Sequence, residues 1–345
     1  MTALKLAVIA GDGIGPEVVA EAIRVLLEVG GVEIERLPWG ADHFLQTGVT
    51  VPPGGYDTLR SFDAIFVGAL GDPRVPDNRH ARDILLGTRF ELDLYVNYRP
   101  VRLLDDRLCP LKNRTRDHVS FVVFRENTEG LYVGAGGRLR ADTDEEIAVQ
   151  EEVNTYRGVE RIVRYAFEFA SHHGLSRVCM ADKSNAMPHG HALWQRVFKA
   201  MSPRYPSIEA THLYIDALAM FLVQSPEQFQ VIVTNNLFGD IITDIGAALQ
   251  GGLGMAASGN IHPGRTSMFE PVHGSAPPLA GKNVANPIGA VLSAALMLET
   301  LGRREDARRI ERAVEGAVHA GETTRDVGGS LGTREAGAAI LKRLG

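Results

Sequence analysis

Residues 234–246 read TNNLFGDIITDIG, and this stretch decides how the rest of the chain is interpreted. Asp240 and Asp244 are four residues apart, a spacing that places both carboxylates on one face of an α-helix. Like charges so placed repel each other unless a cation lies between them, so the pair is a candidate Mg²⁺ or Mn²⁺ site. A solvated helix face with two incidental acids would show the same spacing. The stretch alone leaves both interpretations open.

The residues before this helix predict a buried strand at Val231–Thr234, so the two acids would follow a strand-to-helix junction. The same alternation of β-branched apolar runs and helical patterns recurs along the chain. The other segments are 6–10 followed by 17–29, then 64–68, 119–123 and 178–181. Such alternation predicts an α/β fold with a largely parallel central sheet.

Composition limits the classes of function. A chain of 345 residues should hold about two domains, and 45% apolar residues allow a sizeable core. The net charge of −6 argues against nucleic-acid and membrane-surface partners. The apolar run 6–10 is too short for a signal sequence or a membrane span, so the cytoplasm is the expected location. Cys109 and Cys179 are isolated, which suggests neither a disulfide framework nor a thiolate metal site.

The segment GDGIGPE at residues 11–17 follows a strand and opens a helix, with Pro16 suited to the first helical position. The dinucleotide-binding fingerprint of the classical Rossmann fold requires glycine where this chain has Pro16. We therefore expect a glycine-rich turn close to a ligand, but not a classical Rossmann fold.

Several other polar residues follow apolar strands or interrupt them. Arg89, Arg99 and Arg125 could bind carboxylates with their paired donors, although each could also be an ordinary surface or salt-bridging arginine. Lys183 comes directly after a strand, where α/β sheets carry functional groups. Asp216 interrupts an apolar run, where burying an unpaired acid would be costly, so a cation or a strong donor is expected nearby. Four histidines show no metal-ligand spacing and are expected at the surface: His172, His173, His189 and His191.

The order of motifs resembles a known family. The segments are GDGIGPE, RFELDLYVNYRP, RENTEGLY, DKSN, YIDA, NNLFGDIITDIGAALQGGLGMAASGNI, FEPVHGSAP and KNVANP. They resemble the metal-dependent β-decarboxylating dehydrogenases, which act on isopropylmalate, isocitrate, homoisocitrate, D-malate or tartrate. The resemblance implies a two-domain fold, with a first, cofactor-binding domain at 1–99 and 252–345. The second domain, at 100–251, would carry the metal site and form a homodimer with shared active sites.

The resemblance also implies a role for each matching residue. The metal ligands would be Asp240, Asp244 and, from the neighbouring subunit, Asp216. The substrate would be held by Arg89, Arg99, Arg125 and Asn185. The cofactor loop would comprise Glu270, His273, Gly274, Ser275, Ala276 and Asn286. Lys183 would accept the proton of the substrate hydroxyl as hydride leaves for the nicotinamide, and Tyr132 would protonate the enolate left by loss of CO₂.

The residues ahead of Arg89 bear on the choice of substrate. Leu85 and Leu86 resemble the apolar pair with which family members that act on 3-isopropylmalate contact the isopropyl group. The serine and asparagine of isocitrate enzymes and the added arginine of homoisocitrate enzymes are absent. We therefore predict oxidative decarboxylation of 3-isopropylmalate, as in leucine biosynthesis.

Other functions are weighed against this one. RENTEGLYVGAGGR and LYVNYRPVRLL also resemble D-malate and tartrate dehydrogenases, which is the first alternative, ahead of a homoisocitrate-type enzyme. A non-catalytic regulatory paralogue should have lost one of Tyr132, Lys183, Asp240 or Asp244, and all are present. A metal-dependent phosphohydrolase would leave the arginine, tyrosine and lysine residues unexplained.

The cofactor determinant departs from the family pattern. NAD-dependent members usually carry Asp directly after HGSAP, and NADP-dependent members carry Lys-Tyr in that place, whereas this chain has Pro278-Leu279. NAD is the expected cofactor because the loop has no basic replacement, although NADP is not excluded. Asp326 is an additional candidate for contact with the ribose.

Overall fold

The computed structural model describes residues 3–345, which form two compact units. The first unit holds the chain up to Leu94, Arg99–Val119 and Ala247–Gly345, and the second holds Tyr95–Tyr98 and Ser120–Gly246. The expected domains placed 100–119 in the second domain, but the structure places this segment in the first unit. The reason lies in helix α11 (Arg304–His319), whose C-terminal end binds the segment. Arg107 donates to the carbonyl of Val318 at 2.8 Å.

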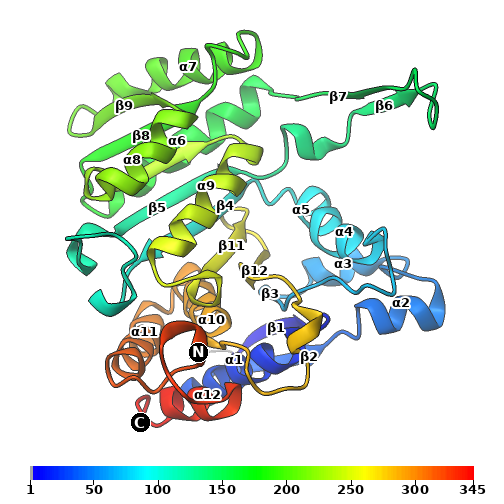
Figure 1. Ribbon diagram of the computed structural model, residues 1–345, viewed down its shortest axis with the longest axis vertical. Helices are drawn as coiled ribbons and strands as arrows, with labels where there is room; N and C mark the ends of the chain where they lie inside the picture. Colours follow the sequence, from blue (N-terminus) through cyan, green and yellow to red (C-terminus); the bar gives the residue numbers. More distant parts are fainter. Residues whose placement is uncertain (1–2) are drawn as a thin grey trace. The chain divides into compact units, whose positions relative to one another are not determined.

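The first unit is a helix-covered sheet with the strand order β2-β1-β3-β12-β11. Its strands are β1 (Leu4–Ile9), β2 (Val32–Arg36), β3 (Ala64–Val67), β11 (Ala257–Ile261) and β12 (Ser267–Pro271). Its other helices are α1 (Gly15–Val29), α2 (Ala41–Thr47), α3 (Gly55–Arg60), α4 (Arg79–Arg82), α5 (Thr88–Glu91), α10 (Ile288–Thr300) and α12 (Thr333–Leu341). Helix α10 is almost entirely buried. Helices α1 and α11 pack against it, and α12 packs against α1 and α11 (Figure 1).

The second unit has four parallel strands in the order β5-β10-β8-β9. These are β5 (Ser120–Glu126), β8 (Arg177–Asp182), β9 (Glu209–Tyr214) and β10 (Val231–Thr234). The helices are α6 (Tyr156–His172), α7 (Gly190–Met201), α8 (Ile215–Gln224) and α9 (Asn236–Leu249). A separate antiparallel ribbon, formed by β6 (Gly136–Leu139) and β7 (Ile147–Gln150), extends from the unit (Figure 1).

Strand β4 (Val96–Arg102) contributes residues to both units. A π-helical turn covers Asp83–Gly87. Short 3₁₀ turns lie at Asp106–Leu108, Arg116–His118, Leu131–Val133, Ser202–Arg204, Pro226–Gln228, Leu253–Met255, Pro277–Leu279 and Arg325–Val327.

The predicted α/β fold with a mixed sheet is confirmed, and strands occur at each expected position. In the large sheet, β11 and β12 are antiparallel neighbours. Only 262–266 separates these strands, and so short a connection permits a hairpin but not the crossover that parallel strands require. Within residues 3–345 we find no helix that is both long and apolar enough to cross a membrane. The cytoplasmic location stays a prediction.

Candidate active site

The candidate site of the second unit forms where three parallel strands end. In the register of the sheet, Thr234 at the end of β10 lies beside Arg125 on β5 and Ala181 on β8. These strand ends are therefore level, and Arg125, Lys183 and the first residues of α9 emerge at one edge of the sheet. Carboxyl ends of parallel strands are the usual position of ligand sites in α/β proteins.

Arg125, Tyr132 and Asp240 form one cluster at this edge. Arg125 is only 1% exposed; its Nε donates to Asn236 Oδ1 at 2.9 Å, and its Nη1 donates to Asp240 Oδ1. The Tyr132 hydroxyl donates to Asp240 Oδ2 at 2.7 Å. A Cβ atom on Gly239 would lie 2.6 Å from the Cβ of Arg125, so only glycine allows α9 to approach the arginine this closely.

The two acids of the opening stretch lie on α9 as expected, and both are accessible to solvent. The side chain of Asp240 is 40% exposed, and Asp244 is exposed. Carboxylate oxygens on one helix face suit a hard cation such as Mg²⁺ or Mn²⁺. Among residues 3–345, however, no three His, Cys, Asp or Glu side chains come together as a metal site. Asp240 and Asp244 alone would therefore make an incomplete ligand set, and Asp216 does not join them within the described chain.

Lys183 and Asp216 form a second cluster. The Lys183 ammonium donates to Asp216 Oδ1 at 2.5 Å, and this hydrogen bond lowers the pKa of the Asp216 carboxyl. The sequence led us to expect a cation or a strong donor next to Asp216, and Lys183 is that donor, although the Asp216 side chain is 66% exposed. Asp216 lies in the first turn of α8, and that helix buries Leu218 and Leu222 on another face.

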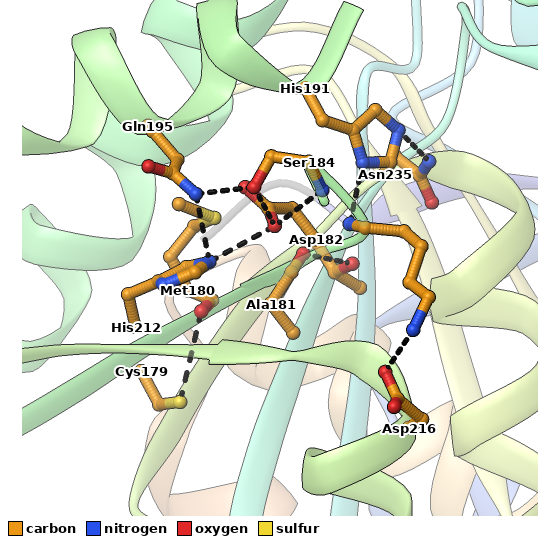
Figure 2. A network of polar contacts seen from close by, with 12 residues as sticks. Cys179, Met180, Ala181, Asp182, Ser184, His191, Gln195, His212, Asp216 and Asn235 are labelled. Carbon is orange, nitrogen blue, oxygen red and sulfur yellow. Dashed lines mark hydrogen bonds and ion pairs between the residues drawn. The ribbon is translucent and has the colours of Figure 1, made fainter. Parts of the chain in front are cut away.

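Buried polar side chains hold the backbone around Lys183 (Figure 2). Asp182, 1% exposed, accepts from the amide of Ser184 and from His212 Nε2, each at 3.0 Å. His191 accepts from the Lys183 amide at 2.7 Å and is fully buried, so the prediction that it is a surface histidine is wrong. The sequence did contain the signal, because His191 precedes the buried Trp194 by three residues on one face of α7.

In the first unit, Arg89 is buried against an acid. Its Nη2 donates to Glu270 Oε1 at 2.9 Å, and Asn260 donates to the same oxygen at 2.9 Å. Within the described part of the chain, the buried Nε of Arg89 has no hydrogen-bond partner, so it remains available to a bound carboxylate. Glu270, which the resemblance assigned to the cofactor loop, lies on β12 and orients Arg89. Arg99 lies on β4 and is 8% exposed.

The leucine pair ahead of Arg89 lies in the π-helical turn, where an ordinary short helix was expected. Such turns are rare and occur frequently at functional sites. Tyr56 supports this turn, since its hydroxyl donates to the carbonyl of Asp83 at 2.8 Å. Leu85 packs against the core and Leu86 is half-buried, which leaves apolar surface near Arg89 for a ligand.

The expected cofactor residues of the first unit also lie close together. The carbonyl of Ser275 accepts from the amide of Ile14 at 2.8 Å, which joins the cofactor loop to the glycine-rich turn. Asn286 donates to Asp326 Oδ2 at 3.0 Å. Burial lowers the pKa of His273, and its Nε2 is buried with no partner in residues 3–345. The neutral His273 ring can thus donate or accept a hydrogen bond, and the Asn286 amide and the Asp326 carboxylate offer further polar groups. Such a set suits the hydroxyl groups and ring nitrogen atoms of a nucleoside.

The remaining residues of the loop are more open. Gly274 is exposed, Ala276 is half-buried with a φ of +37°, and Asn185 after Lys183 is exposed. A cavity of about 510 Å³ lies beside the loop and is lined by Gly11, Gly13, Trp39, His43, Arg74 and Pro277. Its volume is typical of small-molecule sites.

Comparison with known proteins identifies the family to which this arrangement belongs. The family described as isocitrate/isopropylmalate dehydrogenase matches residues 5–340. The chain belongs to the isocitrate/isopropylmalate dehydrogenase family. It is 46% identical to a 3-isopropylmalate dehydrogenase of Thermobifida fusca, over 99% of this chain and 98% of that protein. It is 47% identical to the protein of the same name from Corynebacterium jeikeium, over 99% of this chain and all of that one.

Two solved structures share the fold of this chain. An isocitrate dehydrogenase from Methylococcus capsulatus has a TM-score of 0.91 and is 35% identical, covering 100% of this chain and 99% of its own. The TT0538 protein from Thermus thermophilus has a TM-score of 0.88 and is 36% identical, over 99% of this chain and 68% of that chain. The family is thus shown by sequence and by fold, and the prediction made from the motifs is confirmed.

Proposed function

We propose that this chain catalyses the NAD-dependent oxidative decarboxylation of 3-isopropylmalate to 2-oxo-4-methylpentanoate. The observation that carries the proposal is the apolar Leu85-Leu86 pair in the turn ahead of Arg89, in a chain 46% identical over nearly its full length to a 3-isopropylmalate dehydrogenase. An apolar group of the substrate would pack against the exposed part of this pair, while arginines bind its carboxylates. Isocitrate would place a third carboxylate against the leucines, at a high desolvation cost.

The chemistry divides among the chain's own residues. Arg89, with its partner-free Nε, and the buried Arg125 would bind substrate carboxylates. Lys183 would take the proton of the substrate hydroxyl as hydride passes to the nicotinamide. After CO₂ is lost, the Tyr132 hydroxyl would give a proton to the enolate carbon. A divalent cation held by Asp240 and Asp244 would supply Lewis-acid polarisation of the hydroxyl and ketone oxygens.

We propose further that two subunits share each active site. Asp240 and Asp244 lack a third acidic ligand among the described residues, while Asp216 is exposed and hydrogen-bonded to Lys183. Asp216 of a second copy could complete the metal site, and Lys183 would enter the same site because it is bonded to that acid. Asn185 would accompany Lys183.

Exposed apolar side chains in the second unit support a dimer. Met220 and Val223 on α8 are 47% and 51% exposed, and Ile241 on α9 is 55% exposed. Leu139 and Ile147 on the β6–β7 ribbon are 63% and 49% exposed. In the proposed dimer, a second subunit would cover such exposed apolar groups.

We propose NAD as the cofactor, with its adenosine part near His273, Asn286 and Asp326. Asp326 is a carboxylate that could accept from the ribose hydroxyls, a role that the family normally gives to the residue at position 278. Pro278 and Leu279 lie in an exposed 3₁₀ turn without charge, so they offer nothing to a 2′-phosphate.

An assay grid tests the proposal. It crosses 3-isopropylmalate, D-malate, tartrate, isocitrate and homoisocitrate with NAD and NADP in the presence of Mn²⁺. We expect the highest kcat/KM with 3-isopropylmalate and NAD. A higher kcat/KM with D-malate would assign the chain to the first alternative, and no turnover of any diacid would remove the enzymatic function.

A further inference from the structure

The fully buried His191 has a protonation state that its contacts determine. The backbone amide of Lys183 donates to His191 Nδ1 at 2.7 Å. An N–H group needs a lone pair as acceptor, so Nδ1 carries no proton and the neutral ring has its proton on Nε2. That nitrogen lies 3.2 Å from Glu152 Oε1, to which it donates. His191 therefore links the backbone of Lys183 to a carboxylate from a distant part of the chain.

The same carboxylate also binds the start of α9. Asn235 Oδ1 accepts from the amide of Phe238 at 2.9 Å, which makes Asn235 the N-cap of this helix and fixes the orientation of its amide group. Its Nδ2 then donates to Glu152 Oε1 at 2.7 Å. Nδ2 is also 3.2 Å from His191 Nε2, but both nitrogens carry hydrogens, so both donate to Glu152 instead of to each other.

His191, Glu152 and Asn235 form a buried cluster. Asn235 is 3% exposed, and the side chain of Glu152 is 9% exposed. Burial acts to raise the pKa of Glu152, whereas the hydrogen bonds from His191 and Asn235 favour its carboxylate form and act to lower the pKa. The ring of Phe238 packs edge-on against His191, with centroids 5.4 Å apart. The carboxylate is thus held in place by donors from two segments.

We propose that His191 is a positioning residue that, through Glu152 and Asn235, fixes the backbone of Lys183 against the first turn of α9. This inference rests on the proposed function, since Lys183 and Asp240 are there the catalytic base and a metal ligand. In a dimer with shared sites, one chain gives Lys183 to one site and Asp240 to the other. The cluster then connects the part of the chain that enters one active site to the part that enters the other (Figure 2 shows His191 beside Asn235).

Two substitutions separate the two hydrogen bonds of His191. The carboxamide oxygen of His191→Asn takes the place of Nδ1 and keeps the bond from Lys183, whereas the longer His191→Gln keeps the bond to Glu152. We expect His191→Gln to lower kcat by on the order of ten- to a hundred-fold, because a small displacement of a catalytic group has that cost. His191→Asn keeps the acceptor for Lys183 but loses the bond to Glu152, so its kcat should fall as well, and both variants should bind Mn²⁺ as the wild type does. His189→Asn and His189→Gln, at an exposed position two residues earlier, are the matched controls.

Hydrogen exchange of the Lys183 amide gives a second measurement that needs no substrate. Exchange should be faster in His191→Gln by on the order of ten-fold and unchanged in His191→Asn, because only the first loses the acceptor. A purely structural role would make kcat and exchange follow the melting temperature of each variant, whichever bond is lost, and this would overturn the inference. A wild-type protein that oxidises no diacid would refute the proposed function, whereas the exchange comparison would still decide whether His191 holds the lysine.

Discussion

The Lys183 ammonium and Asp216 Oδ1 are 2.5 Å apart, which joins the end of β8 to the first turn of α8. This pair brings a proposed base and a proposed metal ligand to the same place. Asp240 and Tyr132 form another pair, joined at 2.7 Å through Asp240 Oδ2. A shared active site would then combine the first pair of one subunit with the second pair of its partner.

Mixing of inactive variants tests this arrangement. Lys183→Ala and Asp240→Asn should each abolish oxidation, but a mixed dimer would have one site in which both residues are intact. Random exchange of subunits should therefore restore roughly a quarter of the wild-type rate, because half of the dimers are mixed and each has one good site of two. The measurement is the rate with 3-isopropylmalate, NAD and Mn²⁺ after the two variants are mixed under conditions of subunit exchange.

The control for this experiment mixes Lys183→Ala with Asp216→Asn. Both changes affect the same half of the site, so every site of the mixed dimer is defective and the rate should not recover. If the rate recovers in this control, the shared site is contradicted. It is also contradicted if the rate does not recover in the first mixture although the subunits have exchanged.

The leucine pair gives the prediction on specificity. Leu86→Ala removes apolar surface that would face the isopropyl group, so kcat/KM for 3-isopropylmalate should fall by roughly 10- to 100-fold. D-malate has no side chain there, and its kcat/KM should change by less than about three-fold. Leu27→Ala, at a 56% exposed position on α1, controls for loss of a leucine elsewhere. An equal loss with both substrates would show that Leu86 stabilises the turn and does not select the substrate.

How much of this the sequence could predict depends on how local each feature is. The pairing of Asp240 with Asp244 follows from a four-residue spacing, and the strand that precedes them follows from an apolar run. The donor expected beside Asp216 is present as Lys183. Asp216 itself stays exposed because the apolar run around it is a helix that buries Leu218 and Leu222 on another face.

Other features depend on residues far apart in the chain. The bond between Arg89 and Glu270 joins positions 181 residues apart, so no spacing rule could find it. The π-helical turn is supported by Tyr56 of helix α3, whose hydroxyl donates to the carbonyl of Asp83. These two residues are 27 positions apart, so the local sequence of the turn does not reveal the contact. His191 could have been found from its periodicity with Trp194, but its role required the position of Lys183.

The cofactor loop gives a prediction on affinity. Pro278→Asp would restore the carboxylate that family members use to bind the ribose, so KM for NAD should fall by roughly three- to ten-fold, as expected for one added hydrogen bond worth about 1 kcal/mol. KM for 3-isopropylmalate should stay unchanged. Leu279→Asp, the next residue and 42% exposed, controls for the added charge. An equal effect of both substitutions would attribute the change to charge alone.

The last prediction concerns the pH dependence of stability, through Glu126 at the end of β5. Glu126 is 1% exposed, and burial raises its pKa from 4.5 to about 7, although hydrogen bonds from Thr128 and Glu129 oppose this rise. Between pH 4.5 and about 7, the folded chain therefore binds more protons at this site than the unfolded chain does. The contribution of Glu126 to stability is present below pH 4.5 and is lost as the pH rises through about 7.

Glu126→Gln should remove this loss, because the amide stays neutral at every pH. The free energy of unfolding of the variant, relative to that of the wild type, should therefore increase by roughly 1–3 kcal/mol from pH 5 to pH 8. Urea titration at each pH measures this difference. Glu33→Gln, at an exposed position on β2, should show no such gain. A variant that loses stability most at pH 8 would mean that Glu126 is ionised in the folded protein and is held by Arg161, whose guanidinium is 3.7 Å away.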